Sequence, residues 1–359
     1  MDTDFLVIGG GIAGVSVGAR LSHLGRVTVL EAEQGLGYHA SGRSAALFDE
    51  CLGAAEIVAL NKASHSYHAT ENGGVLSDRG LMVVGRAEDA ERYEADRVHM
   101  KLRTLTRDEA REMVPILNPD MLAFAGLNEA AWDLDTDLLI QNFARQIRGN
   151  GGAVLTGQRV GAIARTGAGW SVETAKDTYQ GRVLVNAAGA WVDEIARMAG
   201  VTPLGFTPMR RSMARLPAPG GHDMTTWPMI EGAGERWYCK PDAGKLLVSP
   251  AEEHPMEPHD AYADDMVLAE GLARYEEMMT EPVTRVETNW AGLRTFAPDR
   301  LLVIGFDPHT PDFFWHAGQG GYGFQTAPAA SALAADVVAG RAPEVGAELA
   351  AALSPARFA

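Results

Sequence analysis

Three glycines and one carboxylate near the start of the chain carry the clearest chemical signal in the sequence. Gly9, Gly11 and Gly14 stand in the pattern GxGxxG, and Glu31 follows 17 residues after Gly14. In this pattern the first glycine permits a tight turn, the second lets the backbone approach a pyrophosphate, and the third lets a helix pack closely on a strand. A carboxylate at the position of Glu31 can accept hydrogen bonds from ribose hydroxyls. These four residues predict a dinucleotide-binding site.

The elements around these residues have the order that such a site requires. The apolar run 5–8 predicts a strand that leads into the glycines, the stretch 12–24 predicts a helix, and residues 26–30 predict a second strand that ends at the carboxylate. The first N–H groups of the helix, near Ile12 and Ala13, would face the phosphates at the positive end of the helix dipole. Because strand, helix, strand and acid are in register, the motif is more specific than the glycines alone.

Similar patterns occur in the middle and near the end of the chain. Residues 182–185 predict a buried strand followed by small residues and a helix, and residues 301–305 and 313–316 predict two strands before the glycine-rich segment 318–323 and an alanine-rich helix. Two glycine-rich strand-to-helix junctions at opposite ends indicate that both ends build one nucleotide-binding domain. The strand-like, turn-rich segment 205–290 would then belong to a second domain, inserted in pieces.

Composition limits the class of protein. The chain has 359 residues, a formal net charge of −16 and two cysteines, Cys51 and Cys239. The negative charge argues against nucleic acid and against an anionic membrane surface as partners, and two cysteines exclude a disulfide framework or a cysteine-rich metal site. No apolar run is long enough to cross a bilayer, and the polar residues after Met1 are not typical of a signal peptide. We therefore expect a soluble cytoplasmic enzyme without a metal.

Seven segments spread over nearly the whole chain form a second and more specific pattern. They are GGGIAG at 9–14, GYHASGRSAA at 37–46, VLVNAAGAW at 183–191, PMRRS at 208–212, YCKPDAG at 238–244, WAGLR at 290–294 and GQGGYGFQT at 318–326. In order and spacing they resemble the FAD-dependent superfamily of glycine oxidase, sarcosine oxidase and D-amino-acid oxidase, and most closely the bacterial D-arginine dehydrogenases. The resemblance implies FAD as the cofactor. Its attachment would be non-covalent, because no late cysteine follows Cys239.

The resemblance also implies a fold class and a division of the chain. The fold is α/β: a Rossmann-like FAD-binding domain of the glutathione-reductase type with an inserted α+β substrate domain on an antiparallel sheet. Residues 1–80, 145–204 and 290–359 would form the discontinuous FAD-binding domain, and residues 81–144 and 205–289 the substrate-binding domain. A pure NAD enzyme is disfavoured, because it would have no use for the second glycine-rich junction.

The contacts of the family to FAD fall on a large set of residues. The loop that holds Ser41 and Arg43 would wrap the pyrophosphate and the flavin ring, Val160 would offer its backbone to adenine, and the turn at Trp191 would contact the cofactor again. From the side chains alone, Arg43 also fits a surface ion pair, and Val160 and Trp191 fit core positions. The implied FAD-binding residues are Gly9, Gly11, Ile12, Ala13, Gly14, Glu31, Ala32, Ala40, Ser41, Arg43, Ser44, Ala45, Ala46, Val160, Ala188, Gly189, Trp191, Gly292, Gly320, Gly321, Tyr322 and Gly323.

Five residues are candidates for the substrate site. Arg294 is the candidate carboxylate clamp, because a planar guanidinium can hold a carboxylate through two hydrogen bonds. The resemblance adds the hydroxyl of Tyr238, a second positive charge at Arg211, and Gln325 with the Gly321 carbonyl as acceptors for a substrate amine. A neutral amine would pass its C–H hydride to flavin N5 without a protein base, so that orientation supplies most of the catalysis. The resulting imine would hydrolyse to a 2-oxo acid.

Three leucines depart from the pattern of the D-arginine dehydrogenases. Leu81 stands where that family has the carboxylate that reads a cationic side chain, and Leu47 and Leu52 stand at its loop histidine and lid tyrosine. A cation buried against this wall would lack a partner, unless Glu231 or Glu235 supplied one. We therefore expect an apolar or small D-amino acid, or an N-alkyl or cyclic amino acid, and not arginine or lysine.

Two other function classes fit the same scaffold. A 2-hydroxy-acid dehydrogenase would use the same clamp with a base for the hydroxyl proton, and His316 is the histidine nearest to Arg294 in the sequence. A non-catalytic flavin subunit of a larger dehydrogenase would have an incomplete pocket, which the retained WAGLR and YCKPDAG segments disfavour. His39, near the flavin loop, fits a structural role better than a catalytic one. The electron acceptor stays open between a quinone, a carrier protein and oxygen, and so does the oligomeric state.

Overall fold

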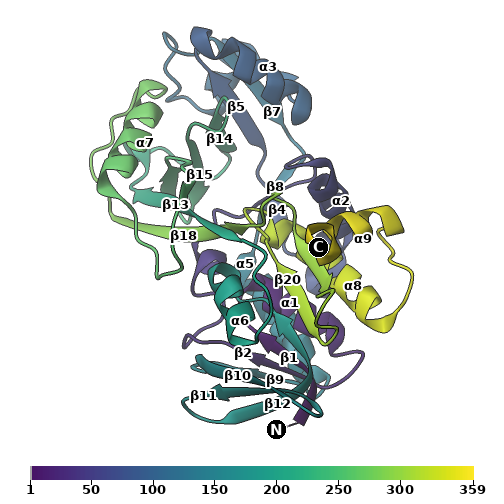
Figure 1. Ribbon diagram of the computed structural model, residues 1–359. Coiled ribbons are helices and arrows are strands. Elements are labelled where there is room, and N and C mark those ends of the chain that lie inside the picture. Colours follow the sequence, from purple (N-terminus) through teal and green to yellow (C-terminus); the bar gives the residue numbers. More distant parts are fainter. Residues whose placement is uncertain (1) are drawn as a thin grey trace.

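The opening motif folds as the sequence predicts in the computed structural model, which describes residues 2–359 (Figure 1). β1 (Asp2–Ile8) leads into the glycine turn, α1 (Ile12–Leu21) follows, and β2 (Val27–Leu30) runs parallel to β1. All four residues of β2 are buried, which is typical of a strand covered on both faces. A Cβ atom at Gly14 would lie 1.8 Å from the carbonyl oxygen of Gly9, so the helix packs on the turn only because residue 14 has no side chain.

This motif lies at the centre of an eight-stranded sheet. The parallel strands run in the order β9 (Ala153–Leu155), β2, β1, β12 (Thr178–Asn186) and β20 (Phe313–Ala317). Strands from both ends of the chain therefore belong to one sheet, with β12 between β1 and β20. Three further strands pair antiparallel at this sheet: β10 (Val160–Thr166) and β11 (Gly169–Thr174) beside β12, and β19 (Val303–Phe306) beside β20.

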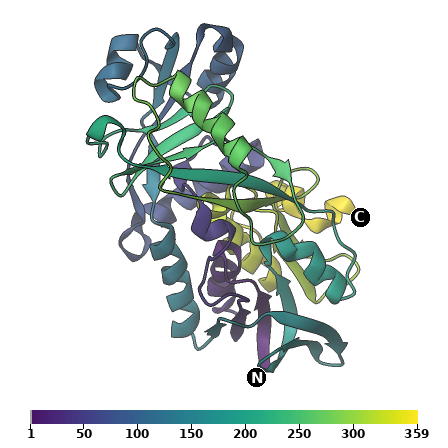
Figure 2. The same ribbon diagram turned by 90° about the vertical axis from the view of Figure 1, so that its left-hand side faces the viewer.

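Helices cover both faces of this sheet. One face carries the largest apolar core. The helices α1, α2 (Ala55–Thr70), α5 (Thr136–Gly149) and α8 (Gly323–Ala339) contribute to it, and α9 (Ala347–Leu353) packs against it. The other face packs on α6 (Val192–Met198). Both ends of the chain lie in this region, as Figures 1 and 2 show. In the part of the chain that the structure describes, no helix has the length and apolarity needed to cross a bilayer.

The second region is built on a nine-stranded sheet, drawn in the upper half of Figure 1. Its neighbouring strands are antiparallel except for one parallel pair, β5 with β14. In chain order its strands are β5 (Leu81–Gly85), β6 (Arg103–Thr104), β7 (Phe124–Asn128), β13 (Thr207–Leu216), β14 (Met229–Gly232), β15 (Tyr238–Asp242), β16 (Lys245–Ser249), β17 (His254–Pro255) and β18 (Thr288–Phe296).

Three helices complete the second region, and a small third sheet packs against apolar clusters of both regions. The helices are α3 (Ala90–His99), α4 (Arg107–Met113) and α7 (Asp265–Glu277). A three-stranded antiparallel sheet consists of β3 (Leu47–Asp49), β8 (Ala131–Leu134) and β4 (Leu76–Asp78).

The strand pairing bears on the predicted division of the chain. β18 pairs with β13 from Thr288 to Phe296, so residues 290–296 lie in the second sheet although the sequence placed them with the FAD-binding part. In the same way α5 starts at Thr136, before the predicted boundary at 145, and its residues belong to the core of the first region. The division into an FAD-binding and a substrate-binding domain itself stays a prediction.

Candidate cofactor and substrate site

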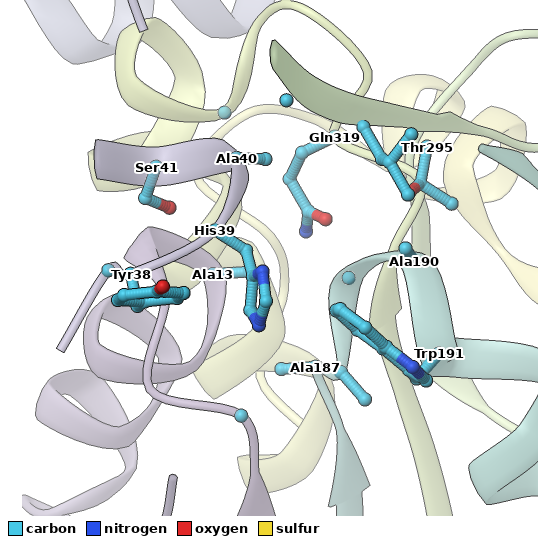
Figure 3. Close-up of a pocket in the computed structure, with 18 of the residues that line it drawn as sticks. Ala13, Tyr38, His39, Ala40, Ser41, Ala187, Ala190, Trp191, Thr295 and Gln319 are labelled. Atoms are coloured by element: carbon cyan, nitrogen blue, oxygen red, sulfur yellow. The ribbon is translucent and has the colours of Figure 1, made fainter. Parts of the chain in front are cut away.

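A cavity of about 380 Å³ lies where the two regions meet, and both regions supply its walls. The first region contributes the turn between β1 and α1, the loop 37–45 and the turn 187–191. The second region contributes Arg211, Tyr238 and part of β18. Figure 3 shows how Ala13, Ala40 and Trp191, among others, surround the space. A concave site of this size, with a few polar groups, is typical of a small-molecule or cofactor site.

Most of the predicted FAD-binding residues lie at this cavity, which brings together segments that are far apart in the sequence. Gly14, Ala46 and Tyr322 do not line it, and Gly14 acts through the packing of α1 on the turn. The predicted residues that line the cavity are Gly9, Gly11, Ile12, Ala13, Glu31, Ala32, Ala40, Ser41, Arg43, Ser44, Ala45, Val160, Ala188, Gly189, Trp191, Gly292, Gly320, Gly321 and Gly323.

The carboxylate of Glu31 holds the glycine turn in shape. It accepts hydrogen bonds from the backbone N–H groups of Gly10, at 2.6 Å, and Glu33, at 2.8 Å. The first N–H of α1, at Ile12, donates to the Ser41 hydroxyl oxygen at 3.1 Å. These bonds connect the turn, the second strand and the 37–45 loop. The contact of Glu31 to a ribose stays a prediction.

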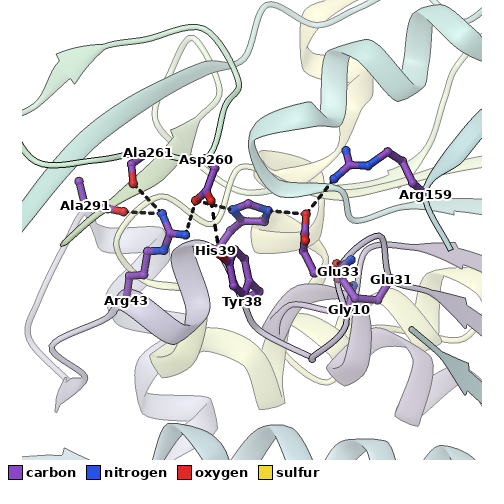
Figure 4. Close-up of polar contacts among 10 residues, drawn as sticks. All are labelled: Gly10, Glu31, Glu33, Tyr38, His39, Arg43, Arg159, Asp260, Ala261 and Ala291. Carbon is purple, nitrogen blue, oxygen red and sulfur yellow. Dashed lines mark hydrogen bonds and ion pairs between the residues drawn. The ribbon is translucent and has the colours of Figure 1, made fainter. Parts of the chain in front are cut away.

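Arg43 ties the loop over the cavity to the second region. Its guanidinium donates to the carbonyl oxygens of Ala261, at 2.9 Å, and Ala291, at 2.7 Å, and pairs with Asp260 (Figure 4). Its terminal nitrogens are thus used in contacts within the protein. This agrees with the ion-pair role that Arg43 also fits from its residue type, while its position in the cavity wall agrees with the predicted role beside the cofactor.

The His39 ring lies between two carboxylates at the same wall. Its Nε2 is 3.3 Å from Glu33 and its Nδ1 is 3.8 Å from Asp260, and Arg159 pairs with Glu33 at 2.8 Å (Figure 4). The ring also packs on Trp191, with 4.6 Å between the ring centroids. These contacts are consistent with the structural role predicted for His39.

Arg294 projects from β18 into the cavity wall beside the turn that precedes α8. Its side chain is 27% exposed, and its ion-pair partner is Glu235, 3.8 Å away. A Cβ atom at Gly321 would lie 3.1 Å from Nη1 of Arg294, so the glycine leaves the space that the guanidinium occupies. The hydroxyl-bearing Tyr238 lines the same cavity and is 3% exposed. The two leading candidates for substrate binding therefore both line this cavity.

Arg211 also lines this cavity, but two carboxylates of the protein already compensate its positive charge. It is 6% exposed and pairs with Glu235 at 2.6 Å and with Glu253 at 3.3 Å. Burial alone would lower the pKa of its guanidinium, but Tyr238 and the two carboxylates outweigh burial and raise it. Arg211 therefore stays charged and paired, which leaves Arg294 as the less engaged cation.

Two other candidates lie away from the cavity. Gln325 is 3% exposed: its side-chain oxygen accepts from the backbone N–H of Asp49 at 2.8 Å, and its carbonyl oxygen lies 3.0 Å from Nε2 of His68. It joins α8 to β3 and α2 and does not line the cavity. His316 is 1% exposed and also lies outside the cavity, and burial lowers its pKa to about 3.

Several polar residues of the cavity wall escaped the sequence reasoning. Gln158 and Arg159 come directly before Val160, and Thr295 comes directly after Arg294, so adjacency to a predicted residue was an available signal. Gln319 lies inside the glycine-rich segment that the sequence singled out. Tyr38 lies inside the motif at 37–46, while Glu33 and His259 also line the cavity and neither composition nor motif marked them for that position.

The fold and the cavity define an α/β protein with a dinucleotide site of the flavin type. The model of one protein family, described as FAD dependent oxidoreductase (DAO), matches residues 4–337. The chain belongs to this DAO family of FAD-dependent oxidoreductases, and its cofactor is FAD. The residues present fit that group, because small side chains at Gly11, Ala13, Ala40 and Ala187 leave room for a ring and a pyrophosphate close to the backbone.

Solved structures and curated relatives agree on the fold. L-proline dehydrogenase from P. horikoshii superposes with a TM-score of 0.82 at 22% identity, over 99% of this chain and 98% of that one. Glycine oxidase from Geobacillus kaustophilus gives 0.79 at 22% identity, over 95% of each chain. The FAD-dependent oxidoreductase domain-containing protein 1 of Bos taurus is 23% identical over 304 residues, which cover 74% of this chain and 61% of that protein.

The first curated relatives are longer proteins. The chain spans 34%, 61% and 48% of the length of three of them. The similarity therefore establishes the fold and the family, and the narrower resemblance to D-arginine dehydrogenases stays a prediction.

Proposed function

We propose that this chain oxidises the amine of an amino acid, giving an imine that hydrolyses to a 2-oxo acid. When bound, FAD supplies the hydride acceptor for this reaction. The observation that carries the proposal is the meeting of Arg294 and Tyr238 with the predicted cofactor residues at one cavity. Arg294 would hold the substrate carboxylate through its planar guanidinium, and the Tyr238 hydroxyl would add a donor. Fixing the carboxylate orients the α-carbon, and orientation supplies most of the rate enhancement.

The position of His316 favours an amine over a hydroxyl as the reacting group. A 2-hydroxy acid needs a base for its hydroxyl proton, and His316 was the candidate base. It lies outside the cavity, and its pKa of about 3 comes from complete burial. A neutral amine needs no such base, because its nitrogen lone pair assists the departure of the hydride.

The substrate side chain would be apolar or small. Leu81 packs in one apolar cluster with Tyr238, and Leu47 and Leu52 pack against this cluster. None of the three leucines lines the cavity, but aliphatic side chains packed around Tyr238 disfavour a guanidinium or ammonium group there. A D-amino acid remains our first proposal for the stereochemistry, and an N-alkyl or cyclic amino acid is the second.

Anaerobic bleaching of the bound flavin tests the proposal. The purified yellow protein would be mixed, without oxygen, with D- and L-amino acids, N-methyl amino acids, proline analogues and 2-hydroxy acids. We expect rapid bleaching by one series of amines. Bleaching by hydroxy acids alone would contradict amine oxidation and indicate a 2-hydroxy-acid dehydrogenase. A flavin that no compound reduces would indicate a non-catalytic flavin-binding subunit. Reoxidation by oxygen or by quinones then identifies the electron acceptor.

The ion pairs of Glu235 with the two arginines predict that the Glu235 carboxylate competes with the substrate carboxylate for Arg294. Glu235 lies 2.6 Å from Arg211 and 3.8 Å from Arg294. In Glu235→Gln, Arg294 loses its ion-pair partner, and we expect KM for the best amino acid to fall by about threefold to tenfold, as for a half-exposed ion pair. Since Glu253 contacts Arg211 without contacting Arg294, Glu253→Gln is the matched control. A raised KM in Glu235→Gln alone would mean that this carboxylate helps to bind the substrate.

A further inference from the structure

One buried carboxyl group near the cavity has no partner in the protein. Glu231, on β14, is 5% exposed, and no hydrogen bond or ion pair links its side chain to any other residue among 2–359. Nearby Asp49 differs, because its carboxylate accepts from the backbone N–H of Cys51 and from the amide of Asn128. Buried polar groups are normally paired, so an unpaired carboxyl group at a candidate site points to a ligand.

Glu231 lies on the face of the second sheet that reaches the cavity. It stands directly opposite Tyr238 on β15 and Val83 on β5, and residues directly opposite each other on neighbouring strands share a face. Tyr238 lines the cavity, and Val83 packs with Tyr238 in one apolar cluster. Glu231 itself does not line the cavity, but it stands next to Tyr238, which does.

Aliphatic side chains pack around Tyr238. Leu81 and Met229 belong to the same cluster as Tyr238, and Leu47 and Leu52 pack against its edge. None of these side chains has a hydrogen-bonding N–H or O–H group or an oxygen acceptor. Apart from the hydroxyl of Tyr238, Glu231 is therefore the polar group that a substrate side chain would meet along this part of the second sheet.

The surroundings of Glu231 favour its uncharged form. Burial first, and then the nearby carboxylates of Glu235 and Asp96, raise the pKa of Glu231 well above its ordinary value. Asp49 acts in the same direction and Arg211 opposes it, but Arg211 is already paired with Glu235. An uncharged carboxyl group presents one O–H donor and one carbonyl acceptor.

We propose that Glu231 binds the end of the substrate side chain and that its partner there is an uncharged hydrogen-bonding group, a hydroxyl or a carboxamide. This inference rests on the proposed function and narrows it to small amino acids with a neutral polar end. An ammonium has three donors and a guanidinium five, and the aliphatic side chains around Tyr238 offer no further acceptor for them. A hydroxyl or carboxamide needs fewer partners and brings no charge into these surroundings.

Pairs of amino acids with the same shape test this inference on the holoenzyme. Asparagine and leucine differ in their polar end but not in branching, and so do threonine and valine. Each pair is used in the enantiomer that bleaches the flavin fastest. In the wild-type protein we expect the polar member of at least one pair to have a kcat/KM about tenfold or more above its apolar partner, as for one buried hydrogen bond. Reduction by any member keeps the proposed function intact, whichever member is preferred.

Two variants separate hydrogen bonding from charge. In Glu231→Leu we expect the polar-to-apolar ratio to fall about tenfold while the apolar partner reacts as before. In Glu231→Gln, which keeps a neutral donor and acceptor, the ratio should stay within about threefold of the wild type. Glu253→Gln, which removes a carboxylate that pairs with Arg211, is the control for a general effect of charge.

The remaining outcomes overturn the inference. An unchanged ratio in Glu231→Leu would show that Glu231 does not contact the substrate side chain. Preference for 2,4-diaminobutyrate over both pairs, lost in Glu231→Gln as well as in Glu231→Leu, would show an ionised carboxylate that reads a cation. If Glu231→Leu does not fold, Glu231→Gln with the diamino acid still decides between the two forms.

Discussion

Replacement of Arg294 by alanine is expected to reduce kcat/KM for the amino-acid substrate by about a thousandfold, which corresponds to about 4 kcal/mol and lies within the range for truncating one partner of a buried, hydrogen-bonded charge pair. Arg294 reaches the cavity from β18, and its ion-pair partner Glu235 lies at the long distance of 3.8 Å. Its neighbour Arg211 cannot bind the substrate carboxylate in its place, because Arg211 already forms ion pairs with Glu235 and Glu253. Loss of Arg294 should therefore leave the substrate carboxylate without its main partner.

The conservative variant shows whether charge or geometry matters at this position. Arg294→Lys keeps the charge but loses the planar pair of donors, so we expect an intermediate loss of about tenfold to a hundredfold. Anaerobic flavin reduction gives the rate and the affinity separately, and the flavin absorbance at the start of each experiment reports FAD content. Arg300→Ala is the matched control, since Arg300 is half exposed, packs over Phe296 and pairs with Glu253. Flavin reduction in Arg294→Ala at the wild-type rate would show that the clamp lies elsewhere.

The parts of the fold that the sequence predicted depend on contiguous residues. The strand, helix and strand of the opening motif are coded by apolar runs within 31 residues, and the glycine at position 14 is required by a contact with position 9. The helix predicted after the strand at 182–185 forms from Val192 to Met198, and its apolar residues Val192, Ile195 and Ala196 are spaced to make one buried stripe. Local patterns of this kind are visible without any knowledge of distant contacts.

The parts that the sequence missed depend on contacts between distant segments. Gln325 stands two residues after Gly323, and residues two apart on a helix point to different sides. Gly323 therefore lines the cavity while Gln325 packs against β3. The partners of Arg43 come from residues more than 200 positions later, Asp260 and Ala291, so its contacts could not be derived from its own segment. Glu231 belongs to the same group of cases. Its neighbours on the sheet, Val83 and Tyr238, come from strands that are distant in the sequence, so its surroundings could not be derived from its own segment.

Replacement of Gly14 by alanine is expected to weaken both the fold and the binding of FAD. The new Cβ atom would lie 1.8 Å from the Gly9 carbonyl oxygen and 2.9 Å from its carbonyl carbon. Both are backbone atoms, so no side-chain rotation can relieve the overlap, and α1 must move away from the turn. Overpacking typically costs about 1–3 kcal/mol even where side chains can adjust, and we expect a loss at or above the upper end of that range. FAD affinity should fall as well, because Gly9 and the first turn of α1 form the cavity wall.

Denaturation in urea, with and without added FAD, separates these two effects. A Gly14→Ala protein that is destabilised equally in both conditions has lost packing alone, whereas a larger loss with FAD present shows that the turn contributes to cofactor affinity. Gly149→Ala is the matched control, because Gly149 is also helical, in α5, and a Cβ atom there would meet nothing within 4 Å. We expect that variant to be unchanged or slightly more stable, since alanine restricts the unfolded chain more than glycine does. Equal stability of the two variants would mean that α1 can shift without cost. It would contradict the proposal that Gly14 is needed for close packing of the helix on the turn.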